Sequence, residues 1–349
     1  MDVSASVREH VALAPLTTLG IGGPARYFVE ADSEDAIEPG LAFADRLSLP
    51  VFILGGGSNL LVSDNGFAGL ALHVAPRGVK FDQDGESVLV TAGAGEDWDQ
   101  LVRSCVAQHL GGIECLSGIP GSVGGTPVQN VGAYGQEVSD VIVSVRAFDR
   151  AEHRIVEMSR EECGFGYRKS IFNTTHRDRF IVLEVTYRLA AHGMATIKYS
   201  DLRDFMWARK DPSLRDVREA VLTIRARKGM LLRADDPDSR SAGSFFKNPI
   251  VAASTLDSIR QLAPLAPAIP LSDGTFKLSA AWLIEQAGFA RGDSRGTVAI
   301  STKHTLAIVN RGNATARDVL CLANEINATV RREFDIEMDF EPVMVGFSS

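Results

Sequence analysis

Glycine clusters are the feature of this sequence best suited to chemistry. Gly55-Gly56-Gly57 directly follows the apolar run at 51–54, and eight of the chain's 32 glycines lie between residues 111 and 135. A backbone without Cβ atoms approaches a diphosphate closely and points N–H groups at its oxygens. Turns rarely need so many glycines, so the segment 118–135 indicates a cofactor site. The short Gly93-Ala94-Gly95 is explained by a turn between strands.

Two familiar phosphate-binding motifs are excluded. The pattern G-x-x-x-x-G-K-[ST] does not occur, which argues against a P-loop NTPase. Residues 20–25 (GIGGPA) formally match the dinucleotide fingerprint G-x-G-x-x-A. No clear strand precedes them, and Pro24 disturbs the expected turn into a helix, so this match is accidental.

Composition narrows the class of protein and of partner. A chain of 349 residues predicts two or three domains at roughly 150 residues each. A hydrophobic share of 45% and a charged share of 23% are typical of globular proteins and exclude disorder, collagen and coiled coil for the whole chain. The net charge of −8 argues against nucleic acid or anionic lipid as the main partner. A small anionic substrate held by local cations remains compatible with it.

Compartment is predicted from the N-terminus and the cysteines. The opening residues MDVSASVREH lack the apolar core of a secretory signal, and no apolar run is long enough to span a bilayer. Four cysteines are widely spaced without a C-x-x-C pattern, which predicts neither a disulfide framework nor a metal site. We therefore expect a cytoplasmic protein with buried thiols and no metal.

Periodicity predicts the elements that position these loops. Strands are expected at 51–54, 87–91, 141–148 and 180–189, and a helix at 97–108. A charged helical connection is expected at 201–240. The C-terminal part predicts a strand at 305–309, a helix capped by Asn313 or Thr315, and an alternating strand at 336–341. An α+β protein with mixed sheets follows.

Several segments together resemble one flavoenzyme family. The segments PVFILGGGSNLLV (50–62) and SGIPGSVGGTPVQNVGAYGQE (117–137) resemble UDP-N-acetylenolpyruvoylglucosamine reductase. CGFGYRKSIF (163–172), SAGSFFKNP (241–249), LSAAWLIEQAGF (278–289) and FEPVMVG (340–346) agree, in the family's order. The match runs from about Leu16 to Gly346.

The resemblance implies a fold and a division into domains. It implies an FAD-binding domain of the vanillyl-alcohol-oxidase (PCMH) type in two α+β parts, at 1–70 and 71–210, with the PCMH-type region at about 19–190. A C-terminal α+β substrate-binding domain is expected at 211–349. The residues expected to bind FAD are Gly55, Gly56, Gly57, Ser58, Asn59, Gly118, Ile119, Pro120, Gly121, Ser122, Gly124, Gly125, Thr126, Gln129, Asn130, Gly132, Ala133 and Tyr134.

The resemblance also implies the reaction and its catalytic residues. NADPH reduces FAD, and flavin N5 then gives a hydride to C3 of the enolpyruvyl ether while Ser244 gives a proton to C2. An enol ether resists hydride attack, so its carboxylate must be polarised by positive charge and hydrogen-bond donors. Arg168 is expected to polarise that carboxylate. Glu341 is expected to assist while protonated, which requires a raised pKa. Without a Rossmann motif, NADPH is expected in the substrate's cleft, which gives ping-pong kinetics.

Substrate-binding residues follow from the same resemblance. Tyr167 is expected to line the site, although packing is an alternative role. Tyr199 is expected on a loop that closes over the diphosphate, as in the loop-bearing subtype, and Asn248 is also expected to contact substrate. Lys228 is expected to contact phosphate, but Gly229-Met230 stands where a Leu-Pro pair is common. A solvated helix-face lysine is therefore the alternative for Lys228.

Two other functions compete with this interpretation. One is an FAD oxidase of the same fold acting on an alcohol, which rapid reoxidation by dioxygen would favour. The other is a non-redox protein that binds sugar nucleotides, which a colourless preparation that FAD cannot reconstitute would favour. The family interpretation predicts a yellow monomeric protein whose partner is UDP-N-acetylglucosamine enolpyruvate, with neither nucleic acid nor membrane.

Overall fold

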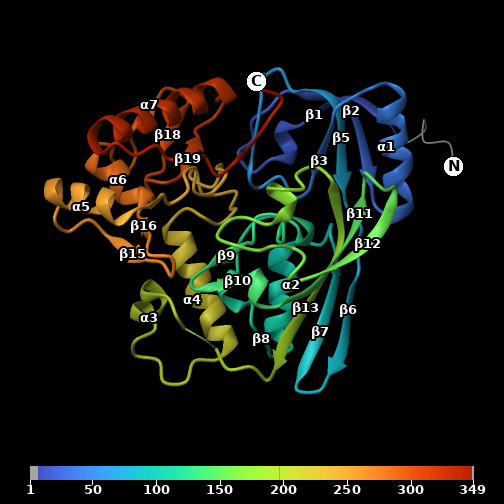
Figure 1. Cartoon of the computed structure of the whole chain (residues 1–349), viewed down its shortest axis with the longest axis horizontal. Helices are drawn as coiled ribbons and strands as arrows, with labels where there is room; N and C mark the ends of the chain where they lie inside the picture. The colour runs from blue at the N-terminus through green and yellow to red at the C-terminus, as the bar shows by residue number, and fades with distance from the viewer. Residues whose placement is uncertain (1–6, 196, 348–349) are drawn as a thin grey trace. The chain divides into compact units, whose positions relative to one another are not determined.

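The chain divides into two compact units. The structure, a computed structural model, describes residues 7–195 and 197–347 (Figure 1). Unit 1 consists of the described residues up to Val11, then Ala25–Gly57 and Phe67–Arg227. Unit 2 consists of Ala12–Pro24, Ser58–Gly66 and the described residues from Lys228 onward. The predicted flavin loop at 55–59 therefore contributes residues to each unit.

One sheet of unit 1 is built around parallel strands. Its strand order is β1 (Arg8–Ala12), β2 (Pro24–Ala31), β5 (Phe67–Val74) and β3 (Val51–Leu54). β5 pairs in parallel with both β2 and β3. Its central residues Leu70, Ala71 and Leu72 are all buried, as expected for a strand covered on both faces. Helix α1 (Ile37–Arg46) joins β2 to β3 and buries Ile37, Leu41 and Ala44. β3 ends at Leu54 as predicted, so the sheet positions the start of the glycine loop at Gly55.

The second sheet of unit 1 is antiparallel. Its order is β12 (Arg154–Ser159), β11 (Ile142–Asp149), β13 (Phe180–Ala191), β7 (Ser87–Gly93) and β6 (Val79–Asp84), and β8 (Leu110–Gly111) also pairs with β13. Residues of β13 alternate between core and surface towards its end, with Val185, Tyr187 and Leu189 buried. The strands predicted at 87–91, 141–148 and 180–189 are thus confirmed: the first and third extend by two residues, and the second is shifted by one.

Helix α2 (Trp98–Ala107) confirms the predicted helix. Asp97 caps it by accepting the Gln100 N–H at 2.8 Å. The five apolar residues that carried the prediction are its buried ones: Trp98, Leu101, Val102, Cys105 and Val106. Trp98 is anchored through Nε1, which donates to the Leu116 carbonyl at 3.1 Å. The helix therefore fixes the start of the segment 116–134.

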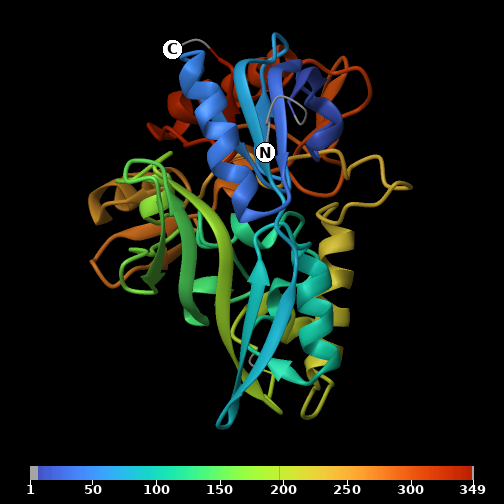
Figure 2. The same ribbon diagram turned by 90° about the vertical axis from the view of Figure 1, so that its right-hand side faces the viewer.

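A smaller core supports the second glycine segment. Helices α3 (Ser200–Phe205) and α4 (Leu214–Arg227) confirm part of the helical connection predicted at 201–240. Residues 206–213 and 228–240 form no helix, so the prediction is wrong there. Leu202 from α3 and Val217, Val221 and Ile224 from α4 pack with Tyr134. Figure 2 shows α4 running beside α2. The short strands β9 (Gly132–Ala133) and β10 (Gln136–Glu137) pair next to Tyr134.

Unit 2 combines small sheets with helices. β4 (Leu60–Val62) pairs in parallel with β20 (Val343–Val345). A second sheet has the strand order β14 (Ile250–Val251), β16 (Phe276–Leu278) and β15 (Ala268–Pro270). A third has the order β17 (Ser294–Arg295), β18 (Val298–Ile300) and β19 (Ile308–Asn310). Helices α5 (Ala253–Leu262), α6 (Ala280–Gln286) and α7 (Ala316–Phe334) pack in the same core.

The C-terminal prediction is confirmed for the helix and wrong for the last strand, and the strand expected at 305–309 is the shorter β19 (Ile308–Asn310). Thr315 is the N-cap of α7, and a capping box with Asp318 closes its first turn. Val319, Leu322, Ala323, Ile326 and Val330 are buried as predicted. The segment 336–341 keeps its alternation, with Ile336 and Met338 buried, but only Phe340 forms a bridge there, to Phe246. The regular strand begins after Pro342, at Val343, because that stretch has β4 as a partner.

The cap of α7 predicts a measurable stability loss. Thr315 Oγ1 accepts the Asp318 N–H at 3.1 Å, and the Asp318 carboxylate accepts the Thr315 N–H at 3.0 Å. Thr315→Ala leaves one helical N–H without its side-chain acceptor and should lower the free energy of unfolding by about 1 kcal/mol. Urea denaturation measures this. Thr329→Ala is the control, because the Thr329 hydroxyl bonds only the Glu325 carbonyl within the same helix. Equal losses for both variants would contradict the capping role.

Candidate active site

In unit 1 the first predicted flavin loop, at residues 55–57, is in direct backbone contact with the second, at residues 121–122. The Gly56 N–H donates to Ser122 Oγ at 3.2 Å. A Cβ on Gly56 would come 2.6 Å from Gly121 Cα, and a Cβ on Gly55 would come 3.0 Å from Ser122 Oγ. Backbone atoms cannot retreat as a flexible side chain can, so position 56 requires glycine. The structure thus brings together residues about 65 positions apart that the sequence predicted to bind one cofactor.

The second loop presents a backbone suited to a diphosphate. Gly121 has a φ of +129° and lies beside Ser122. Within the described part of the chain, the N–H groups of Gly121 and Ser122 donate to no protein acceptor. A Cβ on Gly125 would meet nothing within 4 Å, so there is open space at this loop. Unused N–H groups beside open space fit the diphosphate of FAD.

Other predicted flavin residues hold the loop in place. Thr126 is buried, and its hydroxyl donates to the Val123 carbonyl and pairs with the Tyr187 hydroxyl at 2.8 Å. Asn130 is buried too, and its Nδ2 donates to Glu137 at 2.8 Å and to the Gly166 carbonyl at 3.1 Å. These two side chains shape the loop from behind.

Arg168 occupies a strained turn fastened to the second loop. Gly166 and Lys169 pair across the turn, and Arg168 between them has a φ of +54°, which favours glycine. Its Nη2 donates to the Gly132 carbonyl at 2.9 Å. Holding a non-glycine residue in this region costs about 1–2 kcal/mol, so the arginine is kept there against its backbone preference. That supports a functional role for the half-buried guanidinium.

The predicted tyrosines of unit 1 form two groups. The Arg168 guanidinium carbon lies 5.8 Å from the Tyr167 ring centroid. Tyr134 and Tyr199 meet edge to face with their centroids 5.8 Å apart. Tyr199 is 42% exposed just before α3, as expected for a residue on a loop. Tyr134 also hydrogen-bonds Arg225 from α4, a buried residue that the sequence analysis missed.

In unit 2 the segments of Ser244 and Glu341 are joined. The Glu341 N–H donates to the Phe245 carbonyl at 2.9 Å, next to the bridge between Phe246 and Phe340. Asn59 Nδ2 donates to the Glu341 carbonyl at 3.1 Å, and the Val343 N–H donates to Asn59 at 2.9 Å. A hydroxyl and a carboxyl predicted to act together are thus presented by one paired backbone.

The other predicted residues of unit 2 are placed by turns. Asn248 Oδ1 accepts the Ala280 N–H at 2.9 Å at the start of α6, which fixes its amide. Lys228 precedes Gly229, whose φ is +65° and whose Cβ position lies 3.1 Å from Asp238 Cβ. Asp238 is fully buried and accepts hydrogen bonds from Ser301 and Thr302 while pairing with Arg311. The buried Asp238 therefore packs against the turn that carries Lys228. The position of Asp238 in the sequence does not indicate this contact.

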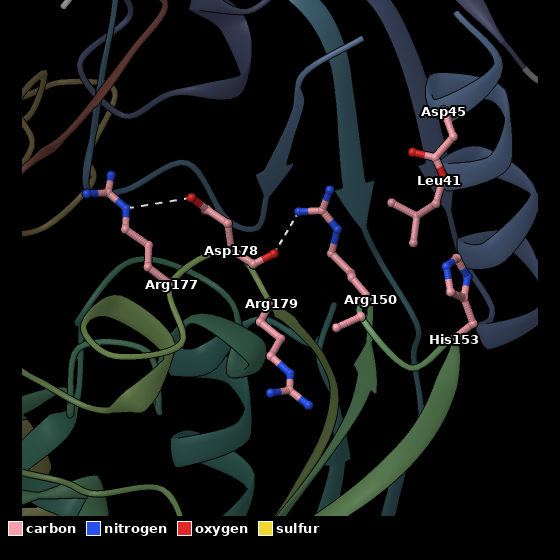
Figure 3. A pocket seen from close by; sticks show the side chains of 8 residues that line it. Leu41, Asp45, Arg150, His153, Arg177, Asp178 and Arg179 are labelled. Atoms are coloured by element: carbon pink, nitrogen blue, oxygen red, sulfur yellow. Dashed lines mark hydrogen bonds and ion pairs between the residues drawn. The ribbon is translucent and has the colours of Figure 1, made fainter. Parts of the chain in front are cut away.

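A pocket elsewhere in unit 1 contains none of the predicted residues. It has a volume of about 380 Å³ and is lined by the residues shown in Figure 3, among them Arg150, Arg177 and Arg179. Arg150 donates to the Asp178 carbonyl, and Arg179 pairs with Asp149 and Glu152. Because its arginines already bind protein oxygens, the pocket is not built to take an anion.

Three of the four cysteines are buried as expected, whereas Cys321 on α7 is exposed. Burial raises the pKa of Cys105, Cys115 and Cys163 to about 12, so these thiols stay protonated. Among residues 7–195 and 197–347 no His, Cys, Asp or Glu cluster has the arrangement of a metal site. Within the same ranges, no helix combines the length and the apolar character that crossing a bilayer demands.

Comparison with known proteins decides the family. The model of the FAD binding domain matches residues 25–159, and that of the UDP-N-acetylenolpyruvoylglucosamine reductase C-terminal domain matches residues 235–345. A UDP-N-acetylenolpyruvoylglucosamine reductase from Thermobifida fusca is 46% identical, with 99% of each chain covered. The chain belongs to the UDP-N-acetylenolpyruvoylglucosamine reductase family. It is an FAD-dependent oxidoreductase, as the sequence predicted.

Further members of the reductase family agree over the whole chain. The Saccharopolyspora erythraea reductase is 45% identical, covering 96% of this chain and 94% of its own. The crystal structure of the Thermus caldophilus reductase has a TM-score of 0.66 and 28% identity, covering 97% of this chain and 99% of its own. The predicted α+β fold, with an FAD-binding domain followed by a C-terminal domain, is confirmed.

The open space beside Gly125 predicts a test of the flavin loop. Gly125→Ala should leave the stability of the apoprotein unchanged, because its Cβ meets no protein atom within 4 Å. It should weaken FAD binding, because the methyl group would occupy space proposed for the cofactor. Gly56→Ala is the comparison and should lower both the stability of the apoprotein and its affinity for FAD, since its Cβ would meet Gly121 Cα at 2.6 Å. Flavin fluorescence titration and urea denaturation measure the two effects. Wild-type FAD affinity in Gly125→Ala would place the cofactor elsewhere.

His304 predicts a pH dependence of stability. Burial, with the positive charges of Lys228 and Arg291, lowers its pKa from 6.5 to about 4. Between these values the unfolded chain binds the proton more readily, so the free energy of unfolding should fall as pH drops from about 6.5 to about 4. His304→Asn should remove this part of the slope in urea denaturation. Lys228→Met should raise the pKa of His304 in an NMR titration, whereas exposed Lys80→Met should not. An unchanged slope in His304→Asn would contradict the assignment.

Proposed function

We propose that the chain reduces UDP-N-acetylglucosamine enolpyruvate to UDP-N-acetylmuramate, a step of peptidoglycan precursor synthesis, with NADPH as cosubstrate. Its relatives over the full length bear the name UDP-N-acetylenolpyruvoylglucosamine reductase. FAD held by the two glycine loops at 55–59 and 118–134 would supply the hydride chemistry that links NADPH to C3 of the substrate. The protein must position the substrate, polarise its carboxylate and supply a proton.

The observation that carries the proposal is the backbone pairing of the two segments that carry Ser244 and Glu341. The hydrogen bond from the Glu341 N–H to the Phe245 carbonyl at 2.9 Å joins their segments. Phe245, Phe246 and Phe340 pack as an aromatic cluster beneath that pairing, with centroids 5.3–5.6 Å apart from Phe340. Such support holds both side chains in one geometry, as catalysis requires. Ser244 gives its hydroxyl proton to substrate C2, which is basic enough to take it, and Glu341 assists at the substrate carboxylate.

Arg168 supplies the positive charge for the substrate carboxylate. A guanidinium is planar and always charged, so it binds a carboxylate with two parallel hydrogen bonds. The bond from Nη2 to the Gly132 carbonyl orients the group. Withdrawing electron density through the carboxylate lowers the barrier to hydride attack at C3.

The remaining predicted residues bind the sugar nucleotide. Tyr167 lines the site beside Arg168, and Tyr199 closes over the diphosphate from its exposed loop, as in the loop-bearing subtype. Lys228 contacts phosphate, and Asn248 donates from the Nδ2 end of its fixed amide. The positive charge beside His304 supports an anion-binding role for Lys228.

We extend the proposal to the organisation of the protein. The FAD-binding region comprises residues 1–70 and 71–210, and residues 211–349 form the substrate domain. The enzyme works as a monomer in the cytoplasm, where reducing conditions suit its buried thiols. Sedimentation of the purified protein tests the monomer.

An anaerobic two-step experiment tests the function. NADPH should bleach the flavin, and UDP-N-acetylglucosamine enolpyruvate should restore its absorption with formation of UDP-N-acetylmuramate. A flavin that NADPH reduces but that only dioxygen reoxidises would reject the proposed substrate.

Ser244→Ala separates the two half-reactions. Reduction of the flavin by NADPH should keep its wild-type rate, while reoxidation by the enolpyruvyl substrate should slow by about 10²–10⁴-fold, the usual contribution of a general acid. Stopped-flow absorbance measures both rates. Ser258→Ala on α5 is the control, because that exposed hydroxyl bonds only the Ser254 carbonyl. Full-speed reoxidation in Ser244→Ala would remove Ser244 from the mechanism.

A further inference from the structure

The carboxylate of Asp99 joins the second flavin loop to helix α4 within unit 1. Asp99 lies in the first turn of α2. Its Oδ1 accepts the Gly118 N–H at 2.6 Å and Arg218 Nη1 at 2.6 Å, and its Oδ2 accepts Arg218 Nη2 at 2.8 Å. Asp99 and Arg218 thus form a bidentate salt bridge, and the same carboxylate also accepts a hydrogen bond from one backbone N–H.

Asp99 and its neighbour Trp98 each bind one end of the turn formed by residues 118–121. The Trp98 N–H donates to the Gly121 carbonyl at 3.1 Å, while Asp99 accepts the Gly118 N–H. Gly118 and Gly121 both have positive φ, at +71° and +129°. Glycine has no side chain to fix its direction, so these two contacts fix the ends of the turn, while Ile119 between them packs against the core of unit 1.

Arg218 makes a negative charge tolerable at this place. Its side chain is only 10% exposed and that of Asp99 is 34% exposed. Burial alone would raise the pKa of Asp99, but the hydrogen bonds from Arg218 and Gly118 outweigh it and lower the pKa, so the group is ionised at neutral pH. An unpaired carboxylate behind a loop that takes a diphosphate would repel that ligand, and Arg218 cancels this charge.

We infer that Asp99 and Arg218 are positioning residues for the FAD diphosphate, acting through the Gly118–Gly121 turn without touching the cofactor. The inference rests on the flavin loops of the proposed function. The carboxylate sets the direction of the turn, and the guanidinium both aims the carboxylate and neutralises it.

Replacing Arg218 tests the pair through FAD affinity. Arg218→Met leaves the carboxylate without its cation and should raise the Kd for FAD by about tenfold to a hundredfold, the range for a lost charge-assisted contact. The double variant Asp99→Asn with Arg218→Met removes the repelling charge as well and should recover most of that loss. Titration of apoprotein with FAD, followed by quenching of flavin fluorescence, gives both Kd values. A double variant that binds FAD no better than Arg218→Met would overturn the inference.

A matched pair in the same unit controls for general destabilisation. Arg179 contacts Asp149 with two hydrogen bonds, at 3.0 and 2.7 Å, and Asp149 also accepts the Ala151 N–H at 2.9 Å. Arg179→Met should lower the free energy of unfolding and leave the Kd for FAD within about twofold of wild type. An equal loss of FAD affinity in both variants would reduce the role of Arg218 to general stability and overturn the inference.

Two further variants keep the test decisive. If Arg218→Met does not fold, the variants Arg218→Lys and Asp99→Asn are compared in its place. Arg218→Lys keeps the positive charge, so it should bind FAD more tightly than Asp99→Asn. Tighter FAD binding by Asp99→Asn would overturn the inference. Gly125→Ala separates this inference from the proposal beneath it. Unchanged FAD binding in Gly125→Ala rejects the flavin loop itself. Weakened binding there, with wild-type binding in Arg218→Met, rejects only the positioning pair.

Discussion

The close approach of two backbones, at Gly56 and Gly121, is the constraint on which unit 1 depends. A single added Cβ would leave only 2.6 Å between non-bonded carbons, so the two backbones can lie this close only because position 56 is glycine. Strand β3 delivers the first loop and helix α2 grips the second. The parallel and antiparallel sheets therefore serve to bring two short glycine segments to one place.

Positive backbone angles mark the residues that the fold holds against local preference. Asn130, Tyr134 and Arg168 all have φ between +46° and +54°, and all three lie in or against the second loop. Asparagine tolerates this region, whereas tyrosine and arginine rarely adopt it. Strain of this kind persists only where surrounding contacts fix it. The Asn130 bonds to Glu137 and Gly166 and the Arg168 bond to Gly132 supply those contacts.

Local patterns were sufficient to predict the regular elements and insufficient to predict long-range partners. The spacing of Trp98, Leu101 and Cys105 defined α2, since burial on one helical face leaves a period in the sequence. Alternation at 336–341 misled, because the same period arises in an extended segment whose only bridge is at Phe340. The pairing of Asp99 with Arg218, 119 positions later, leaves no local pattern at all. The predicted catalytic residues were found by family resemblance, since a lone serine or arginine has no diagnostic spacing.

Helix α4 shows why charge patterns are ambiguous before the fold is known. Its many charged residues suggested a solvated connection, yet Arg218 and Arg225 on it are only 8% exposed. Burying a guanidinium is costly unless polar partners replace water. Asp99 does this for Arg218, and Tyr134 hydrogen-bonds Arg225. Both partners belong to the structure around the second glycine segment, so their hydrogen bonds tie α4 to that segment. If the helix moved away, the partly buried carboxylate of Asp99 would lose its guanidinium partner.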